Sequence, residues 1–301
     1  MKPNESTRRG FLANSLSASA ALAAISQGAL SGFAADKKRG NKMAYGLVTY
    51  QWGKDWDLPK LIANCEKAEA LGVELRTTHA HGVEPTLNDR QREDVAKRFA
   101  DSRVTLVGLG SNERFDNPDP AVVRKAIETS KAFIRLSHDV GGTGVKVKPD
   151  RFYKNVPREK TIEQIGKSLN ILGEYAIGFG QQVRLEVHGQ CAELPTIKAI
   201  MDIADNENVA VCWNSNAQDL QGKGLEANYR LVAKRFGATC HVRPLDSTNY
   251  PYQKLIDLLV ADDYQGWVML EDGRVPKDSV AALTRQAKLF KEMVARAQAS
   301  L

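Results

Sequence analysis

The most constraining feature of this sequence is a regular alternation of strand-like and helix-like segments that begins after Lys42 and continues to the C-terminus. Short apolar runs alternate with longer segments whose apolar residues recur at helical spacing. The expected strands are residues 45–52, 72–78, 104–110, 144–150, 182–189, 209–216, 239–245 and 266–273. The expected helices are residues 57–72, 87–102, 120–142, 160–179, 195–206, 225–237, 251–264 and 278–298.

Eight strand–helix units with no segment left over favour a parallel sheet, because each helix can serve as the crossover between two parallel strands. Eight units in about 260 residues match the size of a (β/α)8 barrel. The alternative is a doubly wound open sheet, which normally carries a Gly-rich phosphate turn after its first strand. Here that turn reads QWGKDWD, without GxGxxG. We therefore predict an α/β fold, a single (β/α)8 TIM barrel over residues 43–301.

Most of the expected strands carry polar side chains on one face and apolar side chains on the other, because alternate strand residues face opposite sides. The polar sets are Glu74, Arg76 and Thr78; Lys146 and Lys148; Arg184, Glu186 and His188; Cys212, Asn214 and Asn216; His241 and Arg243; and Glu271 followed by Asp272. The apolar sets belong against the surrounding helices, so the polar sets must face the barrel axis. Buried charges are costly unless they are paired or bind a metal, which predicts a site at the barrel mouth.

Histidine placement supports a site at the same end of the barrel. Four of the five histidines fall at expected C-terminal strand ends, and these are His79, His81, His188 and His241. Only His138 lies on an expected helix. A single histidine is more often a core residue, but four gathered at one rim favour a functional site.

Four residues at successive strand ends carry a family resemblance. Glu186 in RLEVHG, Asn214 in CWNSN, His241 in CHVRPL and Glu271 in VMLEDG are 28, 27 and 30 residues apart, one strand–helix unit each. This pattern resembles the xylose isomerase-like barrel superfamily of sugar phosphate isomerases and epimerases. The resemblance implies that the four residues hold one divalent cation, and two carboxylates, an imidazole and an amide oxygen suit Mn²⁺, Mg²⁺, Co²⁺ or Zn²⁺.

This sequence departs from the family pattern at one ligand. Asn214 stands where the family has aspartate, and an amide oxygen brings no negative charge to the cation. We therefore expect metal binding that is weaker than with a carboxylate. Asn216 follows two residues later and is expected to face the site.

The resemblance also implies roles for the other polar residues. The metal would bind vicinal sugar oxygens and stabilise an enediolate, while Glu186 and Glu271 act as the acid/base pair. The expected substrate-binding residues are Arg76, His79, His81, Lys148, His188, Asn216 and Arg243. For most of them, ion pairs within the barrel wall, with Glu74 and its neighbours, are an equally open interpretation.

Three functions stay open on these residues. The first is a metal-dependent isomerase or epimerase acting on a non-phosphorylated sugar or keto-sugar. The second is a lyase or dehydratase that uses the same chemistry to expel a substituent from a keto-sugar or glycoside. The third is a non-catalytic sugar-binding barrel, against which the intact pair of Glu186 and Glu271 argues. An oligomer is compatible with the sequence but not indicated by it.

The first 35 residues have the composition of an export signal. STRRGFLANS precedes an Ala- and Ser-rich apolar stretch and then GFAADKKR. The Arg8-Arg9 pair resembles a twin-arginine signal, which implies export through the twin-arginine machinery to the periplasm or another extracytoplasmic space. Residues 36–42 form a basic linker. Export favours non-phosphorylated substrates, since sugar phosphates are mainly cytoplasmic.

Composition excludes other partners. The net charge of +6 is spread among acidic residues, as in RQREDVAKRFADSR, so no nucleic-acid partner is predicted. The sequence after the N-terminal segment has no 18-residue apolar run, so no membrane span is predicted for the mature protein. The four cysteines show no CxxC pair and are expected to be core residues without a disulfide framework.

Overall fold

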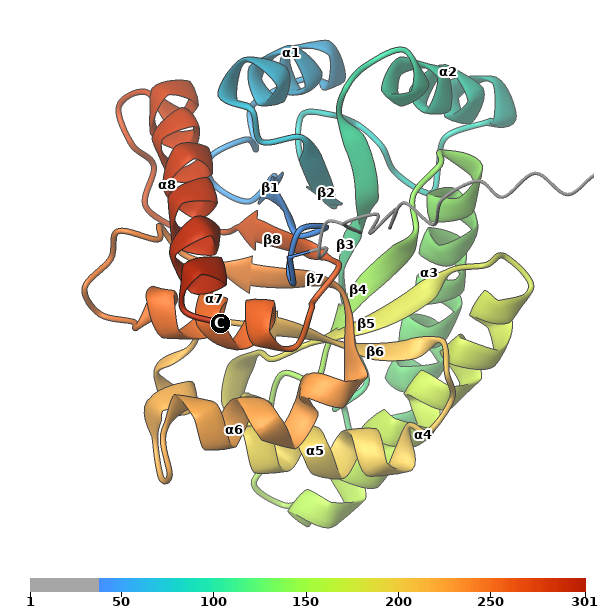
Figure 1. The fold of residues 1–301 in the computed structure, drawn as a ribbon. Coiled ribbons are helices and arrows are strands. Elements are labelled where there is room, and N and C mark those ends of the chain that lie inside the picture. The colour runs from blue at the N-terminus through green and yellow to red at the C-terminus, as the bar shows by residue number, and fades with distance from the viewer. Residues whose placement is uncertain (1–37) are drawn as a thin grey trace, which may run out of the picture. The chain divides into compact units, whose positions relative to one another are not determined.

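The computed structural model describes residues 38–301, and the predicted twin-arginine segment lies outside this part of the chain. Within it, eight parallel strands follow one another in chain order around a closed barrel, and β8 pairs with β1 (Figure 1). The strands are β1 (Ala44–Val48), β2 (Gly72–Arg76), β3 (Thr105–Arg114), β4 (Gly144–Lys148), β5 (Gln182–Glu186), β6 (Val209–Asn214), β7 (Phe236–Val242) and β8 (Trp267–Leu270). The predicted (β/α)8 barrel is confirmed.

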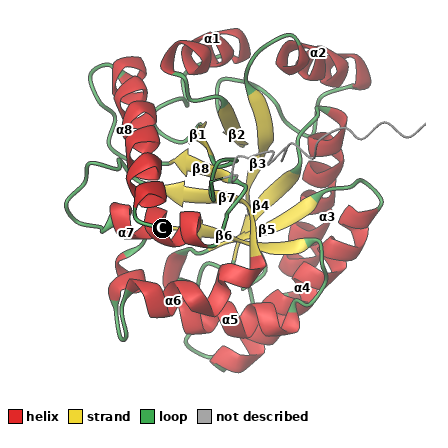
Figure 2. Ribbon diagram, viewed as in Figure 1, coloured by secondary structure: helices red, strands yellow, loops and turns green. Residues whose placement is uncertain are grey.

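Helices surround the barrel on the outside (Figure 2). They are α1 (Leu58–Ala68), α2 (Asp89–Ala100), α3 (Pro120–Asp139), α4 (Arg158–Ile177), α5 (Leu194–Ile203), α6 (Leu225–Val232), α7 (Tyr252–Ala261) and α8 (Ser279–Ala299). Several begin at side chains suited to capping the free N–H groups of a helix start. Asp57 accepts a hydrogen bond from the Lys60 N–H at α1, and Asn88 forms a capping box with Gln91 at α2.

The observed strand ends differ from the predicted ones in a way that affects the site. β3 continues to Arg114 because it still pairs with β4 there, opposite Lys148. β5 and β6 end at Glu186 and Asn214, and β8 ends at Leu270. His188 and Asn216 therefore lie on the loops beyond their strands, whereas Glu271 directly follows β8 and its N–H still donates to the Val242 carbonyl at 2.8 Å.

The barrel has an apolar outside and a largely polar inside. The main core lies between the strands and the helices and includes Val73, Leu75, Val183 and Leu185. Inside the barrel, the apolar cluster among the described residues consists of Val48, Val107 and Met269. The charged side chains that the barrel interior buries are Glu74, Lys146, Arg184, Glu186 and His241, each at most 1% exposed. Within the strands the polar sets face the axis, as predicted, whereas Thr78 lies beyond the end of β2 and is exposed.

Two further predictions concern the chain as a whole. Cys65, Cys191, Cys212 and Cys240, all in the described part of the chain, are free and buried, as predicted. None of the helices within residues 38–301 combines the length and apolar character needed to cross a bilayer. Residues 39–42 of the predicted linker lie against the connection between α7 and β8, with Gly40 N–H bound to the Asp263 carboxylate at 2.8 Å.

Candidate active site at the mouth of the barrel

A polar cavity of about 300 Å³ opens at the C-terminal ends of the strands. It is lined by Tyr50, Arg76, Lys148, Glu186, His188, Gly189, Asn214, Asn216, Arg243, Glu271 and Gly273. Most of the residues predicted for the site are in this set, contributed by β2, β4, β5, β6 and the loops after β5 to β8. The convergence expected from the strand spacing is therefore present. His79 and His81 are the predicted residues that lie outside the lining, and His241 lies below it, fully buried.

Glu186, His241 and Glu271 form a cluster beside this cavity. One ligand atom from each residue lies within 4.8 Å of the other two. His241 Nδ1 is 3.7 Å from Glu186 Oε1 and 3.5 Å from Glu271 Oε2. Two carboxylates and an imidazole at these separations are a donor set that suits Mn²⁺, Zn²⁺ and related cations. A fourth position is left for Asn214 or for a substrate oxygen.

Glu74 orients the imidazole of this cluster from across the barrel. Its carboxylate lies 3.3 Å from His241 Nε2. The other ring nitrogen, Nδ1, is buried and has no hydrogen-bond partner among residues 38–301. A histidine that donates one N–H to a carboxylate and leaves the other nitrogen free has the arrangement of a metal ligand. The residues present therefore fit a divalent cation. Sequence analysis placed Glu74 on the polar face of β2 but could not show which residue it meets.

Lys146 contacts the cluster of Glu186, His241 and Glu271, although it is not among the residues predicted for the site. Its Nζ lies 2.8 Å from Glu186 Oε2, and both side chains are 1% exposed. Burial alone would raise the pKa of Glu186, but Lys146 and His241 hold it well below its usual range. Burial opposes the charge on Lys146, yet the pKa of its ammonium is raised by Glu186, Glu271 and Glu74. The only sequence signal for Lys146 was its place on the polar face of β4.

His241 carries the positive charge that a cation would replace. Burial would lower its pKa, but the neighbouring Cys212 and Glu74 raise it well above the ordinary histidine value. Of these two, Glu74 is the stronger physical cause, because its carboxylate lies 3.3 Å from the imidazole. Metal binding to Nδ1 must displace a proton from a protonated ring, so metal affinity is coupled to pH.

Asn214 contacts the cluster through its amide nitrogen. Its Nδ2 donates a hydrogen bond to Glu186 Oε1 at 3.0 Å, and the residue is 6% exposed. An aspartate at this position has no hydrogen to donate and would repel Glu186. In the absence of a cation, the amide therefore stabilises an arrangement that a second carboxylate would disturb. Its remaining oxygen is the atom available to a metal.

Arg76 reaches the cavity from β2 and is held by several neighbours. Its guanidinium lies over the Tyr50 ring at 5.2 Å, and its Nη1 is 3.2 Å from His79 Nε2. Burial and the charge of Arg76 lower the pKa of His79 to about 4, so its ring is neutral at ordinary pH. A neutral ring accepts from Arg76 through Nε2, and its Nδ1 hydrogen then points to Thr49 Oγ1 at 3.2 Å. His79 therefore positions Arg76 rather than lining the cavity.

Two other predicted substrate-binding residues are engaged with the backbone. His81 is 6% exposed, with Nε2 at 2.8 Å from the Arg76 carbonyl and Nδ1 accepting from the Val83 N–H at 3.0 Å. Asn216 lines the cavity, but its Nδ2 donates to the carbonyls of Val187 and Asn214 at 2.7 and 2.8 Å. His81 thus shapes the loop after β2, and Asn216 joins the ends of β5 and β6.

His188, Lys148 and Arg243 complete the polar rim. His188 Nδ1 is 2.8 Å from Asp150 Oδ1, which fixes the ring beside the cavity. Burial and the nearby Lys146 lower the pKa of Lys148. Arg243 is about half exposed and lies 3.8 Å from Asp272. Lys148 and Arg243 offer N–H donors and Glu271 in the same lining offers acceptors, which suits a ligand rich in hydroxyl groups.

Gly189 is required at the rim for steric reasons. Its φ of +68° lies in the left-handed region, and a Cβ at this position would collide with the backbone carbonyl of Asp150. Glycine therefore lets the loop after β5 approach the loop after β4, which brings His188 to Asp150.

Comparison with known families now identifies the fold family. The profile of the family described as Xylose isomerase-like TIM barrel matches residues 62–293. The chain belongs to this family. Comparison with curated protein sequences gives no significant match.

Solved structures show the same xylose isomerase-like fold. An L-ribulose 3-epimerase matches with a TM-score of 0.72 and 16% identity, covering 85% of this chain and 96% of that one. A 3-keto-D-glucoside 4-epimerase from E. coli gives 0.71 and 15%, covering 83% and 100%. The IOLI protein, solved with a zinc atom, gives 0.71 and 18%, covering 85% and 98%. At these identities the likeness establishes the barrel fold alone.

Proposed function

We propose that this protein is a metal-dependent isomerase or epimerase of non-phosphorylated sugars or keto-sugars. The observation that carries the proposal is the convergence of Glu186, His241 and Glu271 within 4.8 Å at the C-terminal mouth of a xylose isomerase-like barrel. Similar barrels are named as sugar epimerases, which supports the substrate class. The polar cavity of about 300 Å³ has room for one sugar ring.

Each residue of the cluster has a role in this proposal. Glu186, His241 and Glu271 hold a divalent cation, with the Asn214 oxygen as a weaker fourth ligand. When bound, such a cation polarises a carbonyl and stabilises negative charge on its oxygen. Glu186 and Glu271 then act on the carbon beside that carbonyl, one removing its proton and the other returning a proton at the same or the neighbouring carbon.

The remaining polar residues bind and orient the ring. Arg76, Lys148, His188 and Arg243 surround the cavity and can each bond a hydroxyl oxygen. Arg76 is held by Tyr50 and His79, and His188 is held by Asp150, so both are preorganised for binding.

Deuterium exchange tests the reaction directly. Mn²⁺-loaded protein is incubated in D₂O with a panel of sugars and keto-glycosides, and mass spectrometry and NMR locate incorporated deuterium. Deuterium on a carbon next to a carbonyl in at least one substrate, absent with Glu271→Gln, is the expected result. A metal-loaded protein that exchanges no proton across a broad panel would count against an isomerase.

A lyase or dehydratase is the second candidate. The same proton removal can be followed by loss of a substituent from the next carbon, and a structure named as a probable 3-DHS dehydratase shares the fold with a TM-score of 0.62 and 13% identity. Release of water or of a free aglycone from a keto-glycoside distinguishes this reaction from epimerisation. A non-catalytic sugar-binding barrel would instead bind sugar equally well after Glu186→Gln and Glu271→Gln.

We also propose export through the twin-arginine machinery, on the strength of the Arg8-Arg9 pair and the apolar stretch that follows. Replacing both arginines by lysine should keep the protein in the cytoplasm. Cell fractionation after expression in a twin-arginine-competent bacterium measures this, and unchanged export of the variant would contradict the proposal.

A further inference from the structure

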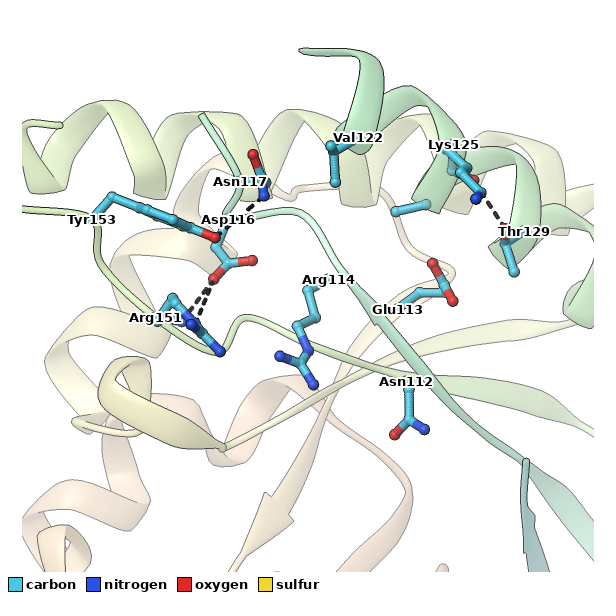
Figure 3. A pocket seen from close by; sticks show the side chains of 11 residues that line it. Asn112, Glu113, Arg114, Asp116, Asn117, Val122, Lys125, Thr129, Arg151 and Tyr153 are labelled. Atoms are coloured by element: carbon cyan, nitrogen blue, oxygen red, sulfur yellow. Dashed lines mark hydrogen bonds and ion pairs between the residues drawn. The ribbon is translucent and has the colours of Figure 1, made fainter. Parts of the chain in front are cut away.

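A second polar cavity, of about 440 Å³, lies beside the candidate active site. It forms where β3 extends beyond its predicted end, between residues 112–117, the N-terminal half of α3 and the loop after β4. Arg114 and Glu113 from the strand, Lys125 from the helix, and Tyr153 from the loop are arranged around it (Figure 3). None of these residues belongs to the metal cluster.

The two cavities share a wall. The Asp150 carboxylate binds Arg114 Nη1 through one oxygen and His188 Nδ1 through the other, both at 2.8 Å. Arg76 Nη2 donates to Asn112 Oδ1 at 3.2 Å. Arg76 and His188 line the mouth cavity, whereas Arg114 and Asn112 line the second cavity. A ligand that fills both cavities would therefore lie across this wall.

Most of the positive charge in the second cavity is already neutralised. Arg114 is paired with Asp150, and the Arg151 N–H donates at 3.1 Å to Asp116, whose carboxylate also lies 4.0 Å from the Arg151 guanidinium. The Lys125 side chain has no ion pair or hydrogen bond among residues 38–301. One free ammonium is too little for a phosphate, which usually meets several cationic groups or backbone N–H groups.

The free groups instead suit hydroxyls. Within the described residues, the Lys125 ammonium and the Asn112 amide nitrogen are donors without partners, and the Glu113 carboxylate is an acceptor without one. The Tyr153 ring forms a flat apolar surface, held in place by the Asn117 amide at 3.3 Å from its hydroxyl (Figure 3). A sugar ring presents hydroxyl donors and acceptors at its edge and C–H groups on its face, and these match the two kinds of surface.

We propose that the second cavity is a subsite for a second sugar ring, so that the substrate is a glycoside. The reacting ring occupies the mouth cavity, which at about 300 Å³ lies at the lower limit of small-molecule sites of roughly 300–1,000 Å³. The second ring lies against Tyr153 and bonds Lys125 and Glu113. The assignment of the reacting ring rests on the proposed function.

Calorimetric titration of the Mn²⁺-loaded full chain tests the subsite. Glucose and fructose are the one-ring probes, and maltose, cellobiose, sucrose and trehalose are the two-ring probes. We expect at least one two-ring sugar to bind about tenfold more tightly than either one-ring sugar. Lys125→Ala and Tyr153→Ala should each remove this advantage without changing binding of the one-ring sugars. Arg124→Ala, at an exposed neighbouring position of α3 outside the cavity lining, is the matched control and should retain the advantage.

Two outcomes overturn the subsite. One is equal affinity for one-ring and two-ring sugars, and the other is an advantage that survives both Lys125→Ala and Tyr153→Ala. Because calorimetry does not require turnover, it separates this proposal from the proposed reaction. If the protein binds two-ring sugars but exchanges no deuterium, the proposed isomerase reaction is contradicted and the subsite is not.

Discussion

Two sets of charged side chains are buried inside the same barrel, and they differ in how fully their polar atoms are paired. The lower set is built on Arg184. Its Nε, Nη1 and Nη2 donate to Gln182 Oε1 at 2.9 Å, the Val107 carbonyl at 3.1 Å and Thr143 Oγ1 at 2.6 Å. Each guanidinium nitrogen thus has an acceptor, and the acceptors lie toward the N-terminal ends of the strands.

The upper set consists of Lys146, Glu186, His241 and Glu271, near the C-terminal ends. His241 Nδ1 is buried without a hydrogen-bond partner in residues 38–301, and it faces the Glu186 and Glu271 carboxylates at 3.7 and 3.5 Å. Burial alone therefore does not distinguish a structural charge from a functional one. The distinction is whether the buried atoms are already satisfied, since an unpaired buried polar group costs free energy that a ligand can recover.

The largest effect is expected from the lower set. Arg184→Met removes three hydrogen bonds from a charged donor, one of them to the buried Val107 carbonyl, and should lower the free energy of unfolding by about 3–5 kcal/mol. Urea unfolding followed by circular dichroism measures this. The Mn²⁺ affinity of the folded fraction should stay unchanged. A variant with the wild-type unfolding midpoint would show that the lower set is not structural.

Substitutions in the upper set should change metal affinity more than stability. Glu271→Gln removes a proposed ligand that is 15% exposed, so Mn²⁺ affinity should fall about 100-fold, about 2.7 kcal/mol, with little change in stability. Asp272→Asn is the matched control, because this neighbouring carboxylate lies outside the cluster. Metal titration should show wild-type affinity for the control. Equal affinity for both variants and the wild type would remove Glu271 from the metal site.

Lys146 tests whether its ammonium neutralises the same carboxylate charge that a metal cation would neutralise. Lys146→Met removes a positive charge 2.8 Å from Glu186, so the metal-free protein should be less stable and Mn²⁺ should bind about tenfold more tightly, about 1.4 kcal/mol. Thermal unfolding with and without Mn²⁺ should give a larger metal-induced rise in Tm than in the wild type. If the metal-induced rise is the same in both proteins, the ammonium and the metal do not compete.

A smaller, pH-dependent effect on stability is expected at Asp219, whose carboxyl is buried. Burial raises its pKa to about 7, although the Asn216 N–H and the Tyr250 hydroxyl donate to it at 2.8 and 2.7 Å. The unfolded pKa is near 4, so the folded state binds the extra proton between about pH 4 and 7, and stability falls as the pH rises through this range.

Asp219→Asn should remove this loss of stability at high pH. The free energy of unfolding of the variant, minus that of the wild type, should be on the order of 1 kcal/mol larger at pH 8 than at pH 5. Urea unfolding at the two pH values measures the difference. A difference that does not vary with pH would mean that the Asp219 carboxyl titrates normally in the folded protein.

The sequence predicted the barrel fold in full but only part of the upper set. Eight alternating units determine the fold because short strands and amphipathic helices leave few other ways to bury their apolar faces. The spacing of Glu186, His241 and Glu271 predicted their convergence, because each lies at or next to the C-terminal end of a parallel strand. It could not predict that Glu74 meets His241, since that contact crosses the closed barrel. The His81 ring contacts the Arg76 carbonyl because the loop after β2 turns back toward the strand. No pattern in the sequence indicated this turn.

The length of β3 was also hidden from sequence analysis. The sequence pattern predicts that the strand ends at Gly110, but pairing between Arg114 and Lys148 continues it. This pairing depends on the neighbouring strand, and the second cavity depends on the extension. Features that rest on contacts between distant elements were therefore the ones that required the structure.

Mn²⁺ titration of the wild type and of Asn214→Asp tests the central claim most directly. We expect one Mn²⁺ per wild-type chain and binding about tenfold tighter in Asn214→Asp, because the carboxylate adds a charge that the amide lacks. Equilibrium dialysis with metal analysis gives the stoichiometry, and calorimetry gives the affinity. A wild-type protein that binds no Mn²⁺ under saturating conditions, with no gain in Asn214→Asp, would contradict the account.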